Sequence, residues 1–232
     1  MSLTKQEQIL SFIEKAKTPL ITFHENFNED AVAAALALKL ILEKLGEKDV
    51  AIACSNFVLP KNLTFLPTAK TVQGQLESIR KFIISVNIAK TKVDTISYNV
   101  KKDKLNFIIS PKDGWFDDHD ISTSNSGFNN DAIIIINASD LEGLGKIYDE
   151  ETEFFYETPL LNIDYKADNE QFGQINMVDM TATSSCEIIG RFFYEFDKEL
   201  INEDIATCLL TGMIANTKSW KTSNVTPQAL TL

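Results

Sequence analysis

The stretch ITFHENFNEDAVAAALALKL, from Ile21 to Leu40, decides the fold. A short apolar strand ends at His24, a polar segment follows, and an almost wholly apolar helix begins near residue 29. A helix that is apolar nearly all round is expected to be buried, typically against a parallel sheet. Strand, polar turn and helix N-terminus together are the usual layout of a phosphate or metal site in an α/β protein.

The rest of the chain favours the same fold class, an α/β domain with a mainly parallel sheet of about five strands flanked by helices. Apolar strands are predicted at 19–24, 49–54, 81–88, 131–137 and 159–164, and helices at 4–17, 29–45, 182–197 and 203–215. Residues 95–110 alternate apolar and polar side chains around KKDK and predict an added β-hairpin. Residues 111–130 are predicted to form a long polar connection.

Composition bounds the class of protein. The 232 residues carry a net charge of −11, which disfavours broad coating of nucleic acid. Cys54, Cys186 and Cys208 have no CxxC spacing and predict buried free thiols in a reducing compartment. The N-terminus is polar and the longest aliphatic run, AIIII, is too short to span a bilayer. We therefore predict a cytoplasmic protein with no membrane partner.

Polar residues follow the predicted strands at the edge where ligands of parallel sheets bind. Together with one residue late in the last predicted helix they form the candidate site: His24, Asn28, Asp30, Asn137, Asp164, Tyr165, Lys166 and Asn216. Because strand ends of a parallel sheet share one edge, we expect these side chains to converge on one cleft.

The same segments resemble the Asp-His-His (DHH) phosphoesterase superfamily, most closely its oligoribonuclease and pAp-phosphatase branch. HENFNEDA resembles the family block H-x-N-P-D-x-D-A, and AIIIIN with ASDLEGLG resembles the aliphatic strand that ends in Asp. NIDYKADNEQFGQIN resembles the naming I-D-H-H motif, ATSSCEII a helix start, and ATCLLTGMIANTKSW the last block. The five blocks stand in the family order and cover roughly half of the chain, whereas residues 60–130 do not fit the pattern.

The resemblance implies a site in which carboxylates and histidines hold two divalent cations, usually manganese, with magnesium as the other candidate. Three of eight such positions keep the family residue, namely His24, Asp30 and Asp164. The other five have changed: Asn28, Asn137 and Asn216 replace aspartates, and Tyr165 and Lys166 replace the two histidines.

These changes predict that no metal pair binds. An amide oxygen can ligate a dication, but it lacks the charge that offsets desolvation of the ion. A lysine ammonium about 4 Å from a dication would be repelled by about 8 kcal/mol at an effective dielectric constant near 20. We therefore expect a vestigial site with no cofactor and no catalytic residue, in which the ammonium of Lys166 compensates Asp30 and Asp164 in place of the metals.

Simpler interpretations stand beside this one. Asn28 and Asp30 could cap the following helix, and Ser184 and Ser185 are better explained as N-caps than as nucleophiles. The acidic residues of 117–120 could bind a cation or form a solvated loop anchored by two aromatic side chains.

Three functions remain open. The first is a non-catalytic DHH phosphoesterase-like protein, one domain over residues 1–232, that binds a small nucleotide or a protein partner. The second is an active phosphodiesterase or phosphatase on short oligonucleotides or nucleotide phosphates, with an altered or single-metal site on His24, Asp30 and Asp164. The third is an assembly protein whose hairpin and 111–130 segment form an interface. The Gly-rich, histidine-containing motif of the family's C-terminal substrate-binding domain has no counterpart in this sequence, so that domain is expected to be absent or truncated.

Overall fold

The computed structural model describes residues 3–76, 81–126 and 129–232. The chain forms two compact units. The core unit consists of Met1–Ser78 and Asn129–Leu232, and the inserted unit is Ile79–Phe128. All eight candidate site residues belong to the core unit. The assignment of one phosphoesterase-like domain stays a prediction.

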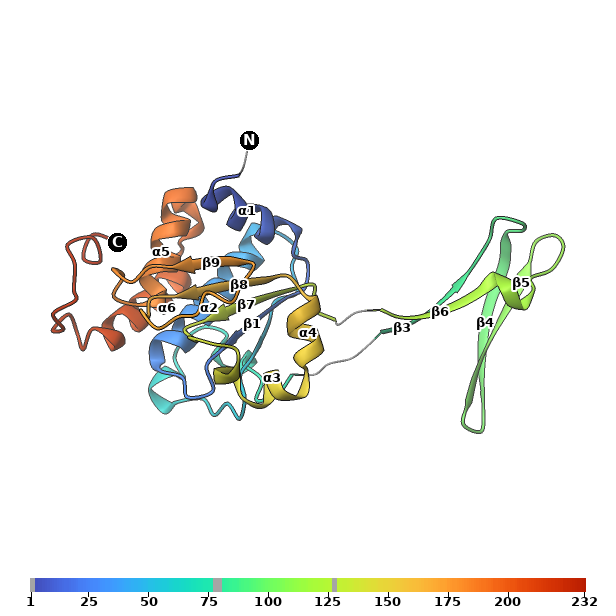
Figure 1. Cartoon of the computed structure of the whole chain (residues 1–232), viewed down its shortest axis with the longest axis horizontal. Coiled ribbons are helices and arrows are strands. Elements are labelled where there is room, and N and C mark those ends of the chain that lie inside the picture. Colours follow the sequence, from blue (N-terminus) through green and yellow to red (C-terminus); the bar gives the residue numbers. More distant parts are fainter. Residues whose placement is uncertain (1–2, 77–80, 127–128) are drawn as a thin grey trace. The chain divides into compact units, whose positions relative to one another are not determined.

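The core unit contains a parallel five-stranded sheet in the order β2-β1-β7-β8-β9 (Figure 1). Its strands are β1 (Pro19–Phe23), β2 (Ala51–Ala53), β7 (Ala132–Ile136), β8 (Leu160–Asp164) and β9 (Ile175–Val178). With the helices around it, this sheet confirms the predicted α/β class.

In the described residues of the core unit, the α-helices are α1 (Lys5–Lys15), α2 (Glu29–Leu45), α3 (Lys146–Glu150), α4 (Thr152–Glu157), α5 (Ser185–Phe196) and α6 (Glu203–Asn216). Short 3-10 turns are η1 (Lys61–Leu63), η2 (Ala69–Thr71), η4 (Glu142–Leu144) and η5 (Lys198–Leu200). Helix α2 is buried along most of its length, as its apolar sequence predicts. No helix in the described part of the chain has the length and apolar character needed to cross a membrane.

The strand order reverses between β1 and β7. The chain moves from β1 through α2 to β2 in one direction, and from β7 through α3 and α4 to β8 in the other. Because such crossovers are right-handed, the two sets of helices lie on opposite faces of the sheet. The carboxyl ends of β1 and β7 therefore flank a topological switch point, the place where ligands bind in open α/β sheets.

Alternate residues of the central strands build the two layers of the core. Ile21, Ile134 and Leu161 are aligned in register and belong to the main apolar cluster with α2. Leu20 and Ile133, in the next register positions, are buried outside that cluster. Because successive side chains of a strand point to opposite faces, apolar side chains are buried on both faces of the sheet.

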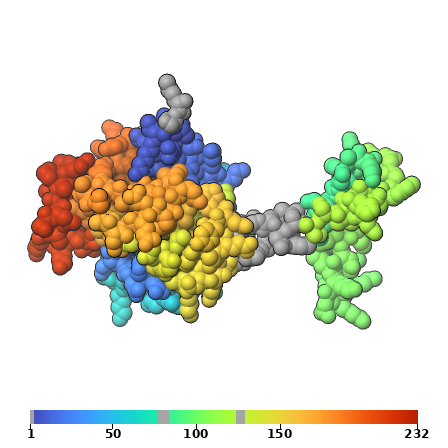
Figure 2. Space-filling model, in the orientation of Figure 1, coloured from blue at the N-terminus to red at the C-terminus, as the bar shows by residue number. Residues whose placement is uncertain are grey.

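The end of the chain packs on the core unit beside α5. In Figure 2 these last residues are red and lie against the orange helical region. Ala229 is buried, and the side chain of Leu232 lies 2.8 Å from the position that a Cβ at Gly190 would take. Gly190 therefore leaves the space that Leu232 fills.

The inserted unit is antiparallel. Strand β3 (Lys81–Val86) pairs with β6 (Ile121–Ser126), and β4 (Val93–Lys101) pairs with β5 (Lys104–Pro111). The 3-10 turn η3 (Asp118–Asp120) precedes β6. The predicted hairpin is confirmed.

Two strand predictions need correction. Residues 81–88 do form a strand, but β3 pairs with β6 and not with the parallel sheet. The fifth place in that sheet belongs to β9, which the sequence did not reveal because it has only four residues between polar flanks. Part of the predicted polar connection is strand β6, whose sequence ISTSNS lacks an apolar alternation.

We predict that the core unit folds without the inserted unit. In the described residues, none of the five strands of its sheet pairs with a strand of the inserted unit. Replacing residues 79–128 with a flexible Gly-Ser linker of about ten residues should preserve a single cooperative urea transition, followed by circular dichroism. Loss of that transition would show that the core unit depends on the insertion.

Candidate functional site

The predicted site residues lie around the switch point. His24 directly follows β1, Asn137 directly follows β7, and Asp164 is the last residue of β8. Asn28 is the N-cap of α2, and Asn216 is the last residue of α6. Side-chain contacts join most of these residues into one cluster.

Three amides and a phenol form a continuous hydrogen-bond network. Asn137 Nδ2 donates to Asn28 Oδ1 at 3.0 Å, and Asn28 Nδ2 donates to Asn216 Oδ1 at 3.3 Å. The Tyr165 hydroxyl also donates to Asn216 Oδ1, at 3.2 Å. These four residues occupy positions where the DHH resemblance implies three aspartates and a histidine. The network carries no net charge.

Hydrogen bonds to backbone groups fix the orientation of the amide side chains in this network. The N–H of Ala31 donates to Asn28 Oδ1 at 2.9 Å, so that oxygen faces the start of α2. Asn216 Nδ2 donates to the carbonyl of Thr183. Asn28 therefore caps α2, as the simpler interpretation predicts, and also belongs to the network. The Oδ1 atom of Asn137 is buried without a hydrogen-bond partner, and Asn137 has a φ of +57°, which Asn tolerates better than most residues.

Asp30 does not cap its own helix. It is fully buried near the start of α2, and its carboxylate accepts from the N–H of Ser185 at 2.8 Å and of Cys186 at 3.1 Å. Burial raises the pKa of Asp30, and these two N–H groups act in the opposite direction. The N-terminus of α5 thus supplies the positive end that this buried carboxylate faces.

Asp164 is also fully buried and its oxygens are occupied. Oδ1 accepts from the N–H of Tyr165 at 2.8 Å and from that of Lys166 at 3.3 Å. Oδ2 accepts from Asn169 Nδ2 at 2.8 Å. Asn169 lies in the polar segment after β8 and was not among the predicted site residues.

The predicted role of Lys166 is not what the structure shows. No ion pair joins Lys166 to Asp30 or Asp164, all three of which are described residues. Its ammonium donates to the carbonyl of Asn137 at 3.3 Å. The physical reason is that both carboxylates already accept hydrogen bonds from N–H groups, which compensate them without a cation.

The phenol of Tyr165 lies near enough to Asp30 and Asp164 for their charges to act on it. Burial raises the pKa of its phenol, and the negative charges of Asp30 and Asp164 raise it further. Both carboxylates therefore act on this one hydroxyl, which stays protonated and neutral. A neutral donor costs less to bury than the ammonium that the sequence suggested.

His24 is held by main-chain contacts. Its Nδ1 accepts from the N–H of Asn26 at 2.9 Å, which assigns the proton of the neutral ring to Nε2. A Cβ at Gly143 would lie 2.6 Å from the ring Cδ2, so only glycine fits there. Gly145 has a φ of +63° and leaves space for the Glu25 carboxylate. Both glycines lie in the segment ASDLEGLG, but no role was predicted for either of them from the sequence.

The residues of this site do not fit a dinuclear metal centre. Across residues 3–76, 81–126 and 129–232, no three His, Cys, Asp or Glu side chains are grouped so that they could hold a metal ion. The two retained carboxylates already accept hydrogen bonds from N–H groups, and the amides bond to one another. A metal pair would have to displace these hydrogen bonds without gaining the anionic ligands that hard dications require.

Of the two serines expected to be N-caps, Ser184 caps α5, whereas Ser185 is the first residue of that helix and its buried Oγ has no hydrogen-bond partner among the described residues. Ser184 Oγ accepts from the N–H of Glu187 at 3.1 Å.

Asp117 caps η3, and Lys90 forms ion pairs with Asp117 and Asp120 at 3.5 and 3.4 Å. Trp115 is 79% exposed, so the expected aromatic anchoring of this acidic loop is wrong for Trp115.

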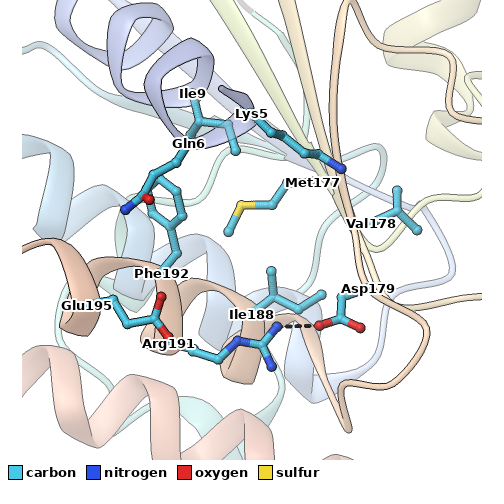
Figure 3. A pocket seen from close by; sticks show the side chains of 10 residues that line it. All are labelled: Lys5, Gln6, Ile9, Met177, Val178, Asp179, Ile188, Arg191, Phe192 and Glu195. Carbon is cyan, nitrogen blue, oxygen red and sulfur yellow. Dashed lines mark hydrogen bonds and ion pairs between the residues drawn. The ribbon is translucent and has the colours of Figure 1, made fainter. Parts of the chain in front are cut away.

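A cavity of about 340 Å³ lies elsewhere, between α1, β9 and α5 (Figure 3). Its lining mixes apolar side chains, such as Met177 and Phe192, with charged ones. Arg191 is bonded to Asp179 across it, as Figure 3 shows. None of the eight predicted site residues lines this cavity.

We predict that Asn28→Ala destabilises the protein by about 1–3 kcal/mol, because it removes a helix cap and two network partners at once. Urea unfolding measures the loss. Asn26→Ala is the matched control in the same turn, since Asn26 is exposed, and it should change the free energy of unfolding by less than about 0.5 kcal/mol. Equal effects of the two changes would contradict the network.

Gly212→Ala is expected to destabilise the protein although alanine favours helices by about 1 kcal/mol. The new Cβ would overlap Cys186 Sγ and lie 2.9 Å from Asp30 Oδ1, at an overpacking cost of about 1–3 kcal/mol. Gly46→Ala is the control, because no atom lies within 4 Å of its Cβ position. A Gly212→Ala variant more stable than the parent would refute this close approach of α6.

Comparison with known proteins supports the fold. No family model and no curated protein sequence matches the chain. Among solved structures, an exopolyphosphatase-related protein from Bacteroides fragilis superposes with a TM-score of 0.68 at 14% sequence identity. The match covers 98% of this chain and 56% of that one, so the present chain spans little more than half of the neighbour's length. The chain therefore shares its α/β fold with an exopolyphosphatase-related protein.

Proposed function

We propose that this protein is a non-catalytic member of the phosphoesterase-like fold that binds a small nucleotide or a protein partner at the switch point between β1 and β7. The observation that carries the proposal is the neutral network of Asn137, Asn28, Asn216 and Tyr165. It occupies four positions at which the DHH resemblance implies metal ligands, three aspartates and a histidine.

Catalysis of phosphoester hydrolysis in this fold would depend on metal ions that activate water and neutralise the phosphoryl group. In this site the amides are hydrogen-bonded to one another, with only Asn137 Oδ1 left without a partner among them, and Asp30 and Asp164 already accept hydrogen bonds from N–H groups. Binding of a ligand without hydrolysis needs no metal pair. The half-buried ammonium of Lys166 has one hydrogen-bond acceptor and further N–H donors, and His24 can donate from Nε2. These donors suit an anionic ligand such as a nucleotide phosphate.

A single-metal phosphoesterase is the other candidate, with His24, Asp30 and Asp164 as ligands. No contact in the structure favours it. The two carboxylates are fully buried, and their oxygens already accept hydrogen bonds. This candidate serves as the alternative outcome of the test.

The test combines metal analysis with turnover of short oligoribonucleotides, pAp and polyphosphate in the presence of manganese. The parent protein should contain no stoichiometric manganese and should hydrolyse none of these substrates above buffer. At least one nucleotide should raise its melting temperature. Two metals per chain, or turnover that Asp30→Ala abolishes, would overturn the proposal.

A gain-of-metal variant provides the positive control. The changes Asn28→Asp, Asn137→Asp, Tyr165→His, Lys166→His and Asn216→Asp complete the eight positions that the resemblance implies. We expect manganese binding by this variant in calorimetry and none by the parent. Adding Asp30→Asn should weaken the acquired binding at least about tenfold, because one anionic ligand is lost. Equal binding by parent and variant would show that the replaced residues do not control the metal.

A further inference from the structure

The long hairpin of the inserted unit has one wholly apolar face. Its register pairs Ile96 with Ile109, Tyr98 with Phe107, and Val100 with Leu105. Because side chains alternate along a strand, these six residues, here called the hairpin face, point to the same side. Tyr98 is 72% exposed and Phe107 is 49% exposed.

The other side of the hairpin is mostly polar. Asn99 pairs with Asn106, whose Nδ2 donates to Asn99 Oδ1 at 3.1 Å, and Ser97 pairs with Ile108. The hairpin is therefore amphipathic, with its apolar side open. Strands β4 and β5 of the hairpin are labelled in Figure 1.

Such a face needs a covering layer. A two-stranded ribbon is only marginally stable in water unless a further layer packs against it. The six side chains present on the order of 500 Å² of apolar surface, which is near the largest patch that monomeric proteins usually expose. In an unpaired hairpin this surface would be an aggregation hazard.

We propose that the hairpin face is the interface for a second copy of this chain, with the two hairpins stacked face to face as a two-layer β-sandwich. Two such faces together remove on the order of 1,000 Å² from water, about the minimum for a specific interface. The hairpin face contains no charged side chain, so stacking two copies buries no unpaired charge. A two-fold axis makes the same face serve both partners.

The charges at the two ends of the hairpin select an antiparallel stack. The tip, residues 101–104, carries three lysines and one aspartate. The open end, residues 90–94 and 112–120, carries five aspartates and three lysines, and Lys90 already pairs with Asp117 and Asp120, so this end has a net negative charge of about two. The backbone bond from Lys112 N–H to the Lys92 carbonyl, at 2.8 Å, holds the segment 112–120 beside the start of β4. An antiparallel stack places each basic tip near the acidic end of the partner, whereas a parallel stack would bring like charges together.

The first experiment measures the mass of the full chain in solution by light scattering and sedimentation. We expect twice the chain mass of 26.0 kDa at micromolar concentration. Tyr98→Lys places a charge at the centre of the hairpin face and should weaken association at least about tenfold. Ser97→Lys is the matched control on the other side of the same strand and should leave the dimer intact.

Cross-linking tests the face directly without removing its apolar character. Tyr98→Cys should be cross-linked between chains by a bis-maleimide with a span of about 10 Å, because the central position lies near the two-fold axis and stacked sheets lie about 10 Å apart, too far for a direct disulfide. Ser97→Cys should not, and the three native thiols are buried. Reversing the tip with Lys101→Glu, Lys102→Glu and Lys104→Glu should reduce the yield, and Asp117→Lys with Asp118→Lys should restore it.

A monomeric mass at every concentration, with no Tyr98→Cys cross-link, would overturn the proposal and assign the face to the core unit or to a different protein. A dimer that Tyr98→Lys leaves intact, with equal cross-linking of Tyr98→Cys and Ser97→Cys, would place the interface elsewhere and would overturn it equally. Neither result depends on the proposed ligand of the core unit.

Discussion

The side chain of Asn28 is the interaction on which the core unit's site depends. One oxygen caps α2 and also accepts from Asn137, while the nitrogen donates to Asn216. This single amide therefore joins the end of β7, the start of α2 and the end of α6. An aspartate in its place could cap the helix and accept from Asn137, but it could not donate to Asn216. The amide network and a site of carboxylate metal ligands therefore exclude one another at these strand ends.

Two buried carboxylates remain within this neutral site, and main-chain groups explain how they are tolerated. Asp30 faces the first N–H groups of α5, and Asp164 accepts from the two residues that follow it. Such donors are fixed by the backbone and lose no side-chain entropy when they bind an anion. Helix α6 approaches Asp30 closely at Gly212, and Asp30 is fully buried. No cation is required to complete either environment.

The sequence predicted the elements that have strong periodic patterns. Helix α2 and strands β1, β7 and β8 were correct because buried apolar runs leave little choice of structure. Strand β9 was missed because four residues between polar flanks carry no measurable period. The strand-end positions of Asn137 and Asp164 followed from topology, since parallel strands end at one edge. The partner of Lys166 did not, because it depends on which donors already occupy the two carboxylates. For Asp30 these donors come from α5, far away in the sequence, and for Asp164 they come from the turn that follows it, whose geometry the residue types do not reveal.

The insertion lies at a point in the chain where it leaves the order of the five-stranded sheet intact. Residues 79–128 enter after β2, which is the outer strand of the sheet, and the chain returns to begin β7 at its centre. That connection must pass over β1 in any case, and lengthening a flexible connection adds only about 0.6 kcal/mol per doubling of its length. The insertion also differs in charge, with eight basic and six acidic residues, whereas the core unit has 14 and 27. The chain therefore joins two units that differ in charge and in packing. The acidic core unit contains a hydrogen-bond network at its strand ends, whereas the near-neutral inserted unit has a hairpin with an open apolar face.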